Sequence, residues 1–314
     1  MTQARLKRVA AGDLVEVRPA REILGTLDAG GTLGGLVFMP EMLEYCGRRF
    51  RVSRRAEQVC TDGAPVPDGE SSVRGFVGDD VVLLTGLRCS GALHGACKRG
   101  CTIFWKEAWL QSVDEKAAAS LSGSGTTSTL PPLPPPQVSA DKYYCQSSEL
   151  LKTTYHLPFS GRVKNSWRNV WRGNYGAFEM LRILTVWGYW RVRQRFSGVY
   201  PRGNCKPTPN DSLELQPGEW VEVKSLDEII ATLDENGKNR GLHFSADMVP
   251  YCGKRLKVEG RADNLIAEGI GVMRHLRNTV ILEGAICDSA VYAFGGCPRE
   301  DLLYWREIWL RRSP

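Results

Sequence analysis

The chain has 314 residues, of which 42% are hydrophobic and 24% are charged, and these values predict two or three ordinary globular units. Its ten cysteines are about 3% of the residues, well below the roughly 8–10% that is typical of a disulfide-dense scaffold. The formal net charge is +6, but the segment 161–196 alone carries +7, from eight basic residues and one acid, which leaves 6 − 7 = −1 for the rest.

The N-terminal segment MTQARLKRVAAGDLVEV has basic residues but lacks the apolar core and cleavage site of a signal peptide. No stretch approaches the ~18 consecutive apolar residues of a membrane span, so we predict no transmembrane segment. We therefore expect a cytoplasmic protein. In that reducing compartment, clustered thiols hold a metal or react more often than they pair as disulfides.

An internal repeat organises the chain. The stretch that begins GDLVEV at Gly12 aligns without a gap to GEWVEV at Gly218, and FWKEAWL aligns to YWREIWL near the end of each copy. A duplicated unit of about 100 residues is a normal domain size. The predicted domains are a Cys-rich first repeat (1–114), a Ser/Gly/Pro-rich linker (115–140), a basic aromatic helical segment (141–206) and a degenerate second repeat (207–314).

Each repeat is predicted to be mainly β with some α. Short alternating strands separated by glycine turns, such as RRFRV and VVLL, favour a small closed barrel. A short helix is expected after Ser225, because Glu228 completes a capping box. The opening GD/EhVEV pattern (h, a hydrophobic residue) resembles SH3-like barrels, so the predicted fold is two duplicated SH3-like barrels plus the helical segment.

The motifs YCGRRFRV, LRC…C…C and FWKEAWL together resemble uncharacterised bacterial cysteine-containing proteins. The resemblance implies the duplicated barrel and carries no activity with it.

Four thiols of the first repeat form the predicted metal site, namely Cys60, Cys89, Cys97 and Cys101. Four thiolates suit a tetrahedral Zn²⁺ site or an iron–sulfur cluster. Cys97 and Cys101 are four residues apart and can face one centre from a tight loop. Further candidate ligands are Cys46, His94 and Cys145.

The second repeat has lost part of this set, because Ile266 stands where Cys60 is expected and Asp301 where Cys101 is expected. A site without half of its ligands binds poorly. We therefore expect one intact site in the first repeat. The degenerate copy consists of Cys252, Cys287, Cys297 and Asp301.

Two alternatives to a metal site stay open. The cysteines could be buried apolar thiols, which we favour for Cys46 and Cys252, and disulfides rank third. Trp105 and Trp109 could shield a centre, but we expect them in the core.

The basic aromatic segment 161–196 is a candidate surface for single-stranded nucleic acid or for a protein partner, because aromatic rings stack on bases and arginines neutralise phosphates. The residues concerned are Trp167, Arg168, Trp171, Arg172, Arg191 and Arg193. An anionic membrane surface is a further alternative. We favour a structural helix instead, with Trp167 and Trp171 sharing one face packed on a barrel.

No catalytic motif is found, so whether the protein is an enzyme stays open. The leading hypothesis is a cytoplasmic accessory protein that binds zinc or an iron–sulfur cluster and engages an unidentified protein partner. The alternatives are a redox or biosynthetic enzyme with an iron–sulfur or activated-thiol centre, and a single-stranded nucleic-acid-binding protein.

Overall fold

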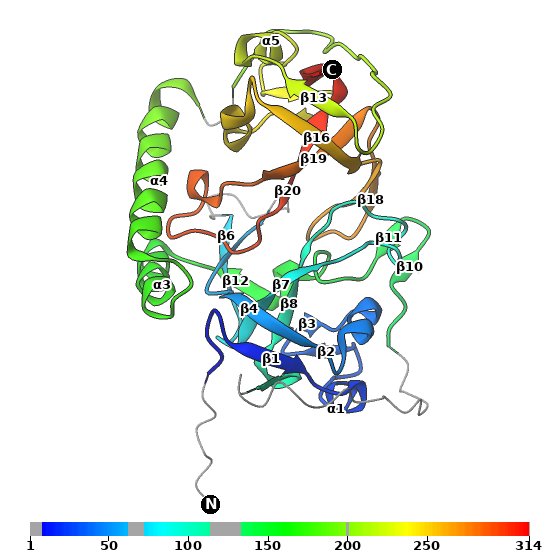
Figure 1. Ribbon diagram of the computed structural model, residues 1–314, viewed down its shortest axis with the longest axis vertical. Coiled ribbons are helices and arrows are strands. Elements are labelled where there is room, and N and C mark those ends of the chain that lie inside the picture. Colours follow the sequence, from blue (N-terminus) through cyan, green and yellow to red (C-terminus); the bar gives the residue numbers. More distant parts are fainter. Residues whose placement is uncertain (1–7, 62–71, 114–132, 199–200, 314) are drawn as a thin grey trace, which may run out of the picture.

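The computed structural model describes residues 8–61, 72–113, 133–198 and 201–313. Most of the predicted linker, through residue 132, lies outside these ranges. Figure 1 shows the two repeats one above the other, with a long helix along one side of the molecule.

Each repeat folds into an antiparallel sheet of five strands. The first has the order β8-β7-β4-β1-β9. Its strands are β1 (Leu14–Val17), β4 (Arg49–Arg55), β7 (Val81–Arg88), β8 (Thr102–Lys106) and β9 (Leu110–Ser112). The second has the order β20-β19-β16-β13-β21. Its strands are β13 (Trp220–Val223), β16 (Arg255–Arg261), β19 (Thr279–Ile286), β20 (Leu302–Arg306) and β21 (Leu310–Arg312).

The two sheets agree residue by residue. Val15 pairs with Phe50 in the first, and Val221 pairs with Leu256 in the second. The third strand of each sheet has a register shift at the same place, after Val52 and after Val258. The predicted internal repeat is therefore confirmed as a repeat of β structure.

Short elements complete the repeats. The short α-helices are α1 (Ala20–Leu24) and α5 (Leu226–Ile230). The 3₁₀ helices are η1 (Pro40–Tyr45), η2 (Glu107–Trp109), η4 (Ala246–Tyr251), η5 (Ser289–Val291) and η6 (Glu307–Trp309). The two-residue and three-residue strands pair as β2 (Thr32–Leu33) with β3 (Leu36–Val37), β14 (Lys238–Asn239) with β15 (Leu242–His243) and β17 (Asn264–Ile266) with β18 (Met273–His275). The predicted capping box of α5 is confirmed, since the Ser225 amide donates to Glu228 and the Glu228 amide donates back to the Ser225 hydroxyl.

The segment between the repeats adds three short strands and two longer helices. Strand β12 (Thr154–His156) joins β6 (Val73–Phe76) and β5 (Val59–Cys60), and β10 (Gln137–Ser139) pairs with β11 (Lys142–Tyr143). After the one-turn helix α2 (Leu150–Thr153), α3 (Phe159–Trp171) and α4 (Ala177–Ser197) form a hairpin. Among the described residues, no helix combines the length and apolar character needed to cross a bilayer.

Aromatic residues fill both cores in the same arrangement. Trp105 and Trp109 of the first repeat and Trp305 and Trp309 of the second are fully buried, which confirms the prediction of a core role for the first pair. Trp109 meets Phe38 edge-on with ring centroids 5.2 Å apart. Its indole N–H also donates to the Thr26 hydroxyl, which satisfies its one buried donor.

One carboxylate of the second repeat, that of Glu307, is buried and hydrogen-bonded. Glu307 accepts hydrogen bonds from the backbone amides of Leu213 and Glu214 at 2.7 and 3.0 Å and forms an ion pair with Arg261 at 3.0 Å. Burial alone would raise the pKa of Glu307, but these donors outweigh it and lower the pKa below the ordinary 4.5.

We expect Glu307→Gln to lower the free energy of unfolding at pH 7 by about 1–3 kcal/mol, because charge-assisted hydrogen bonds are lost. A lowered pKa means that the carboxylate contributes stability above pH 4.5, which is lost as the pH falls through the folded-state pKa. Urea unfolding at pH 7 and pH 3 should therefore show a difference between variant and wild type that shrinks in acid. A pH-independent difference would contradict this role, and exposed Glu283→Gln is the control.

The two repeats are joined by loops that reach across to each other. Lys98 donates its amide to Asn264 of the second repeat, and Gln58 of the first donates to the carbonyls of Phe294 and Gly296. Between them lies Glu268, whose carboxylate is fully buried and contacts Arg99 at 3.0 Å and Arg299 at 2.7 Å. The Cys-rich loop of each repeat is therefore held by the other repeat.

Candidate metal centre

The Cys-rich loop of the first repeat connects β7 to β8. The Cys89 amide donates to the Cys101 carbonyl at 2.8 Å, which closes the loop at its base. Inside the loop, the His94 amide donates to Gly91 and the Cys97 amide donates to His94. A Cβ on Gly91 would lie 1.8 Å from the Cys97 carbonyl oxygen, so only glycine allows this close turn.

Three potential ligands of different chemistry meet at the base of this loop. The Cys89 Sγ lies 3.1 Å from Oε1 of Glu41, which η1 presents, and Nδ1 of His94 lies 3.5 Å from the same oxygen. Among the described residues, these three alone form a group of His, Cys, Asp or Glu ligand atoms that all lie within 4.8 Å of one another. Ligand atoms of a tetrahedral zinc site, with bonds of 2.0–2.3 Å, lie about 3.3–3.8 Å apart.

Three polar atoms of this group have no hydrogen bond, although the Cys89 thiol donates to Oε1 of Glu41. His94 is 1% exposed, and neither of its ring nitrogens makes a hydrogen bond. Oε2 of Glu41 is also buried without a hydrogen-bond partner. Each such group costs roughly 1–3 kcal/mol, and buried side chains of this kind are rare in native structures.

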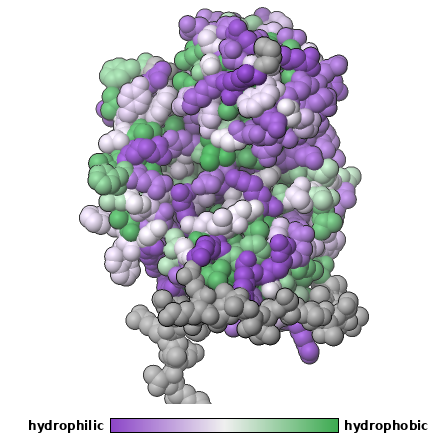
Figure 2. Space-filling view, viewed as in Figure 1, coloured by the Kyte–Doolittle hydropathy of each residue, from purple (hydrophilic) through white to green (hydrophobic). Residues whose placement is uncertain are grey.

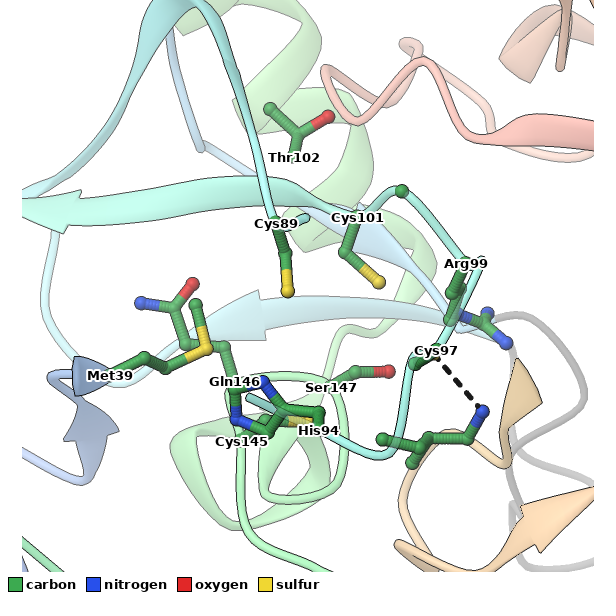
Figure 3. A pocket seen from close by; sticks show the side chains of 12 residues that line it. Met39, Cys89, His94, Cys97, Arg99, Cys101, Thr102, Cys145, Gln146 and Ser147 are labelled. Atoms are coloured by element: carbon green, nitrogen blue, oxygen red, sulfur yellow. Dashed lines mark hydrogen bonds between the residues drawn. The ribbon is translucent and has the colours of Figure 1, made fainter. Parts of the chain in front are cut away.

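A small cavity of about 20 Å³ lies beside the group. Its wall includes Cys89, His94, Cys97, Cys101 and Cys145. Figure 3 shows that the side chains of Cys89 and Cys101 point to the same side of the cavity. A volume of roughly 10–15 Å³ or more admits one water-sized particle, so the space fits a single ion or water molecule.

Burial favours the protonated form of three thiols that line this cavity, those of Cys89, Cys101 and Cys145. It raises the pKa of Cys89, and the neighbouring Glu41 carboxylate raises it further. Burial also raises the pKa of Cys101 to about 12 and raises that of Cys145. A bound cation reverses this preference, because a coordinated thiol loses its proton.

The four thiols that were predicted to form one metal site do not all lie at the same place. Cys89, Cys97 and Cys101 line the cavity, as do His94 and Cys145 from the further candidates. Cys60 lies elsewhere, with its backbone amide 3.2 Å from the Cys297 Sγ of the second repeat. Cys46 is half-buried at the end of η1, where its thiol lies 3.9 Å from the Met42 carbonyl.

Half-buried Cys60 and buried Cys297 form a pair across the two repeats. A hydrogen bond from the Cys60 thiol lowers the pKa of Cys297, and the same contact raises the pKa of Cys60. Arg299 also favours the Cys297 thiolate. The equivalent Cys97 sulfur accepts from the backbone amide of Ile266 at 3.4 Å, as Cys297 does from that of Cys60, but Ile266 has no thiol to donate a second hydrogen bond.

The second repeat holds a different group at the position of the Glu41–Cys89–His94 group. Asp247 stands in place of Glu41, and Tyr292 follows Cys287 by five residues, as His94 follows Cys89. The Tyr292 hydroxyl donates to Asp247 at 3.0 Å, and the Cys287 thiol also contacts this carboxylate. This group is satisfied by its own hydrogen bonds.

The other residues of the degenerate copy have structural contacts. Asp301 forms an ion pair with Arg299 at 3.2 Å, and its carbonyl accepts from the Cys287 amide. Cys252 is half-buried at the end of η4, as Cys46 is at the end of η1.

Glu41 is the one member of the group that the sequence analysis missed. A single glutamate on a helical turn is a common surface residue and carries no ligand signal by itself. The repeat alignment contained a signal, because an acid occupies this position in both copies, five residues before Cys46 and Cys252.

The basic aromatic segment divides into buried and exposed residues. Arg168 and Arg172 form ion pairs with Glu57 and Asp79 of the first repeat, so these two arginines serve the fold. Arg191 and Arg193 lie over the rings of Trp187 and Trp190.

The expectation that Trp167 and Trp171 pack on a barrel is wrong. They are 76% and 85% exposed. Helix α3 instead docks through polar side chains, since Asn165 donates to the Glu57 carbonyl and Asn169 donates to the Gly295 carbonyl. Buried amides with hydrogen bonds replace the apolar face that the i, i+4 spacing suggested.

Comparison with protein-family models, with curated protein sequences and with solved structures found no match to this chain.

Proposed function

We propose that the first repeat binds one metal ion between Glu41, Cys89 and His94, beside the cavity that Cys89 and His94 line. The observation that carries the proposal is His94, which is buried beside a carboxylate and a thiol without a hydrogen bond. Cys101 is the proposed fourth ligand, because it lines the same cavity and points to the same side as Cys89.

Zinc fits this ligand set better than an iron–sulfur cluster. Zn²⁺ accepts sulfur, nitrogen and oxygen ligands in one tetrahedral site, whereas iron–sulfur clusters are held mainly by cysteine thiolates. The cavity of about 20 Å³ also offers room for one ion rather than for a cluster. We therefore propose zinc and keep the cluster as the alternative that analysis of iron and sulfide tests.

The proposed role of the ion is structural. Four protein ligands leave no open position for a substrate, which is the pattern of structural zinc sites. The ion would fix the Cys-rich loop, whose Lys98 and Arg99 contact the second repeat. This supports an accessory or binding protein over a redox enzyme. We further propose that each repeat is an SH3-like barrel and that the protein works in the cytoplasm, where its thiols stay reduced.

Cysteines at equivalent positions in the two repeats provide the test. We expect wild type to hold one zinc ion per chain, Cys89→Ser to lose it, and Cys287→Ser to keep it, since Cys287 lies in the group that is already satisfied by Asp247. The loss of affinity in Cys89→Ser should exceed the 10–100-fold that is typical of outer-shell partners. The measurement is competition with a chromophoric zinc chelator, with circular dichroism as the folding control. Equal losses in both variants would overturn the proposal.

A further inference from the structure

The outer side of α4 carries a line of exposed hydrophobic side chains. Phe178, Leu181, Tyr189, Val192 and Phe196, which we call the α4 stripe, are between 58% and 89% exposed. At about 100° per residue they fall within an arc of about 80° on one side of the helix. Figure 2 shows hydrophobic side chains along the edge of the molecule where α4 lies.

Apart from Tyr189, which lines a hollow between α4 and the second repeat, the stripe is not the side by which α4 packs on the protein. Met180 and Ile183 are buried on the opposite side, next to Ala290 of the second repeat. Helix α4 is therefore apolar on two sides, one of which is covered. An exposed apolar side of this length is uncommon on a monomeric protein and marks an interaction site.

Basic residues accompany the stripe. Arg191, Arg193 and Arg195 are exposed in the last two turns of α4, and Arg182 is exposed in the first half. Glu179 is the one acid of the helix, and it forms an ion pair with Arg54 at 3.3 Å. Arg182 forms an ion pair with Asp288 at 2.9 Å, and the C-terminal half of the helix contains three arginines and no acid, which gives it a net positive charge.

This combination fits an anionic surface with an apolar interior. A second copy of the chain, with the two helices parallel, would bring the three C-terminal arginines of each helix together, which disfavours that arrangement. Single-stranded nucleic acid would match the arginines and the aromatic rings, but Leu181 and Val192 offer no ring on which a base can stack. A bilayer that contains anionic lipids matches all of these features, because aliphatic and aromatic residues enter the interface while arginines meet the headgroups.

We propose that α4 is an interfacial helix that binds the surface of an anionic lipid bilayer through the α4 stripe. The helix has 21 residues and a length of about 30 Å, and it runs along the side of the molecule, where it can lie flat on a membrane. Trp167 and Trp171 lie on the adjacent helix α3 and are the residue type that prefers the membrane interface. The proposal is independent of the metal site.

Vesicle flotation with the full chain tests the proposal. We expect binding to vesicles of phosphatidylcholine with phosphatidylglycerol, and at least about tenfold weaker binding to vesicles of pure phosphatidylcholine. Raising the salt concentration from 0.1 to 0.5 M should also weaken binding, because it screens the arginines. The triple variant Phe178→Ser, Val192→Ser, Phe196→Ser should lose at least about tenfold in partitioning.

The matched control replaces three exposed apolar residues elsewhere, Val77→Ser, Val138→Ser and Ile270→Ser, and should bind as wild type does. Thermal unfolding by circular dichroism checks that both triple variants are folded. Equal loss in the two triple variants, or equal binding to both kinds of vesicle, would overturn the proposal. Two further results would overturn the proposal, each together with the absence of vesicle binding. One is binding of a fluorescent single-stranded oligonucleotide that the stripe variant loses, and the other is dimerisation in sedimentation velocity that the stripe variant loses.

Discussion

Replacing His94 by tyrosine is expected to abolish metal binding while the first repeat stays folded. The second repeat shows why, since Tyr292 follows Cys287 at the same spacing and donates its hydroxyl proton to Asp247 at 3.0 Å. A tyrosine at position 94 can satisfy Glu41 in the same way, and it offers no ring nitrogen to a metal. The variant should therefore bind zinc at least about 100-fold more weakly, as the loss of a direct ligand requires.

The measurement is zinc affinity by competition titration, together with the thermal midpoint of the metal-free proteins. We expect the metal-free variant to unfold at the same temperature as metal-free wild type or higher, because the substitution removes buried nitrogens that lack a hydrogen bond. A variant that binds zinc as wild type does would refute the assignment of His94 as a ligand. Tyr292→His is the matched control in the other repeat, and it leaves the first site untouched.

Replacing Glu268 by alanine is expected to have the largest effect on stability. Its carboxylate is fully buried and contacts Arg99 and Arg299, whose side chains are also buried, at 2.7–3.0 Å. Removing one partner of a buried ion pair leaves uncompensated charge and costs about 3–5 kcal/mol, far more than the loss of an exposed pair. Because the two arginines come from different repeats, the variant should also weaken the coupling between the repeats.

Urea unfolding followed by tryptophan fluorescence measures this effect. We expect a lower midpoint and a broader transition, since each repeat has its own buried tryptophan pair and the two would unfold less cooperatively. The control is Glu235→Ala, which removes an exposed ion pair with Lys206 and should change the free energy of unfolding by less than about 1 kcal/mol. Similar midpoints for the two variants would contradict the role of Glu268.

The sequence predicted the repeat and its β structure because both copies keep the same alternating strands and glycine turns. It predicted the buried tryptophans because FWKEAWL and YWREIWL stand at equivalent places. The contacts that the loops of each repeat make with the other repeat could not be predicted, because backbone hydrogen bonds such as that of Lys98 with Asn264 leave no pattern in one sequence.

The same limit explains the outcome for the candidate site. The spacing of Cys89, Cys97 and Cys101 indicated a shared location, and all three line one cavity. Cys60 was grouped with them because, like Cys101, it lacks a cysteine counterpart in the second repeat, but the contact between repeats places it beside Cys297. Glu41 belongs to the group only because the tertiary fold places η1 next to Cys89.

Elemental analysis of the anaerobically purified chain tests the central claim most directly, with iron, zinc and acid-labile sulfide measured on the same sample. We expect one zinc ion per chain, no sulfide and no visible absorbance. Iron with stoichiometric sulfide, or a chain that neither holds zinc nor takes it up after reduction of its thiols, would contradict it.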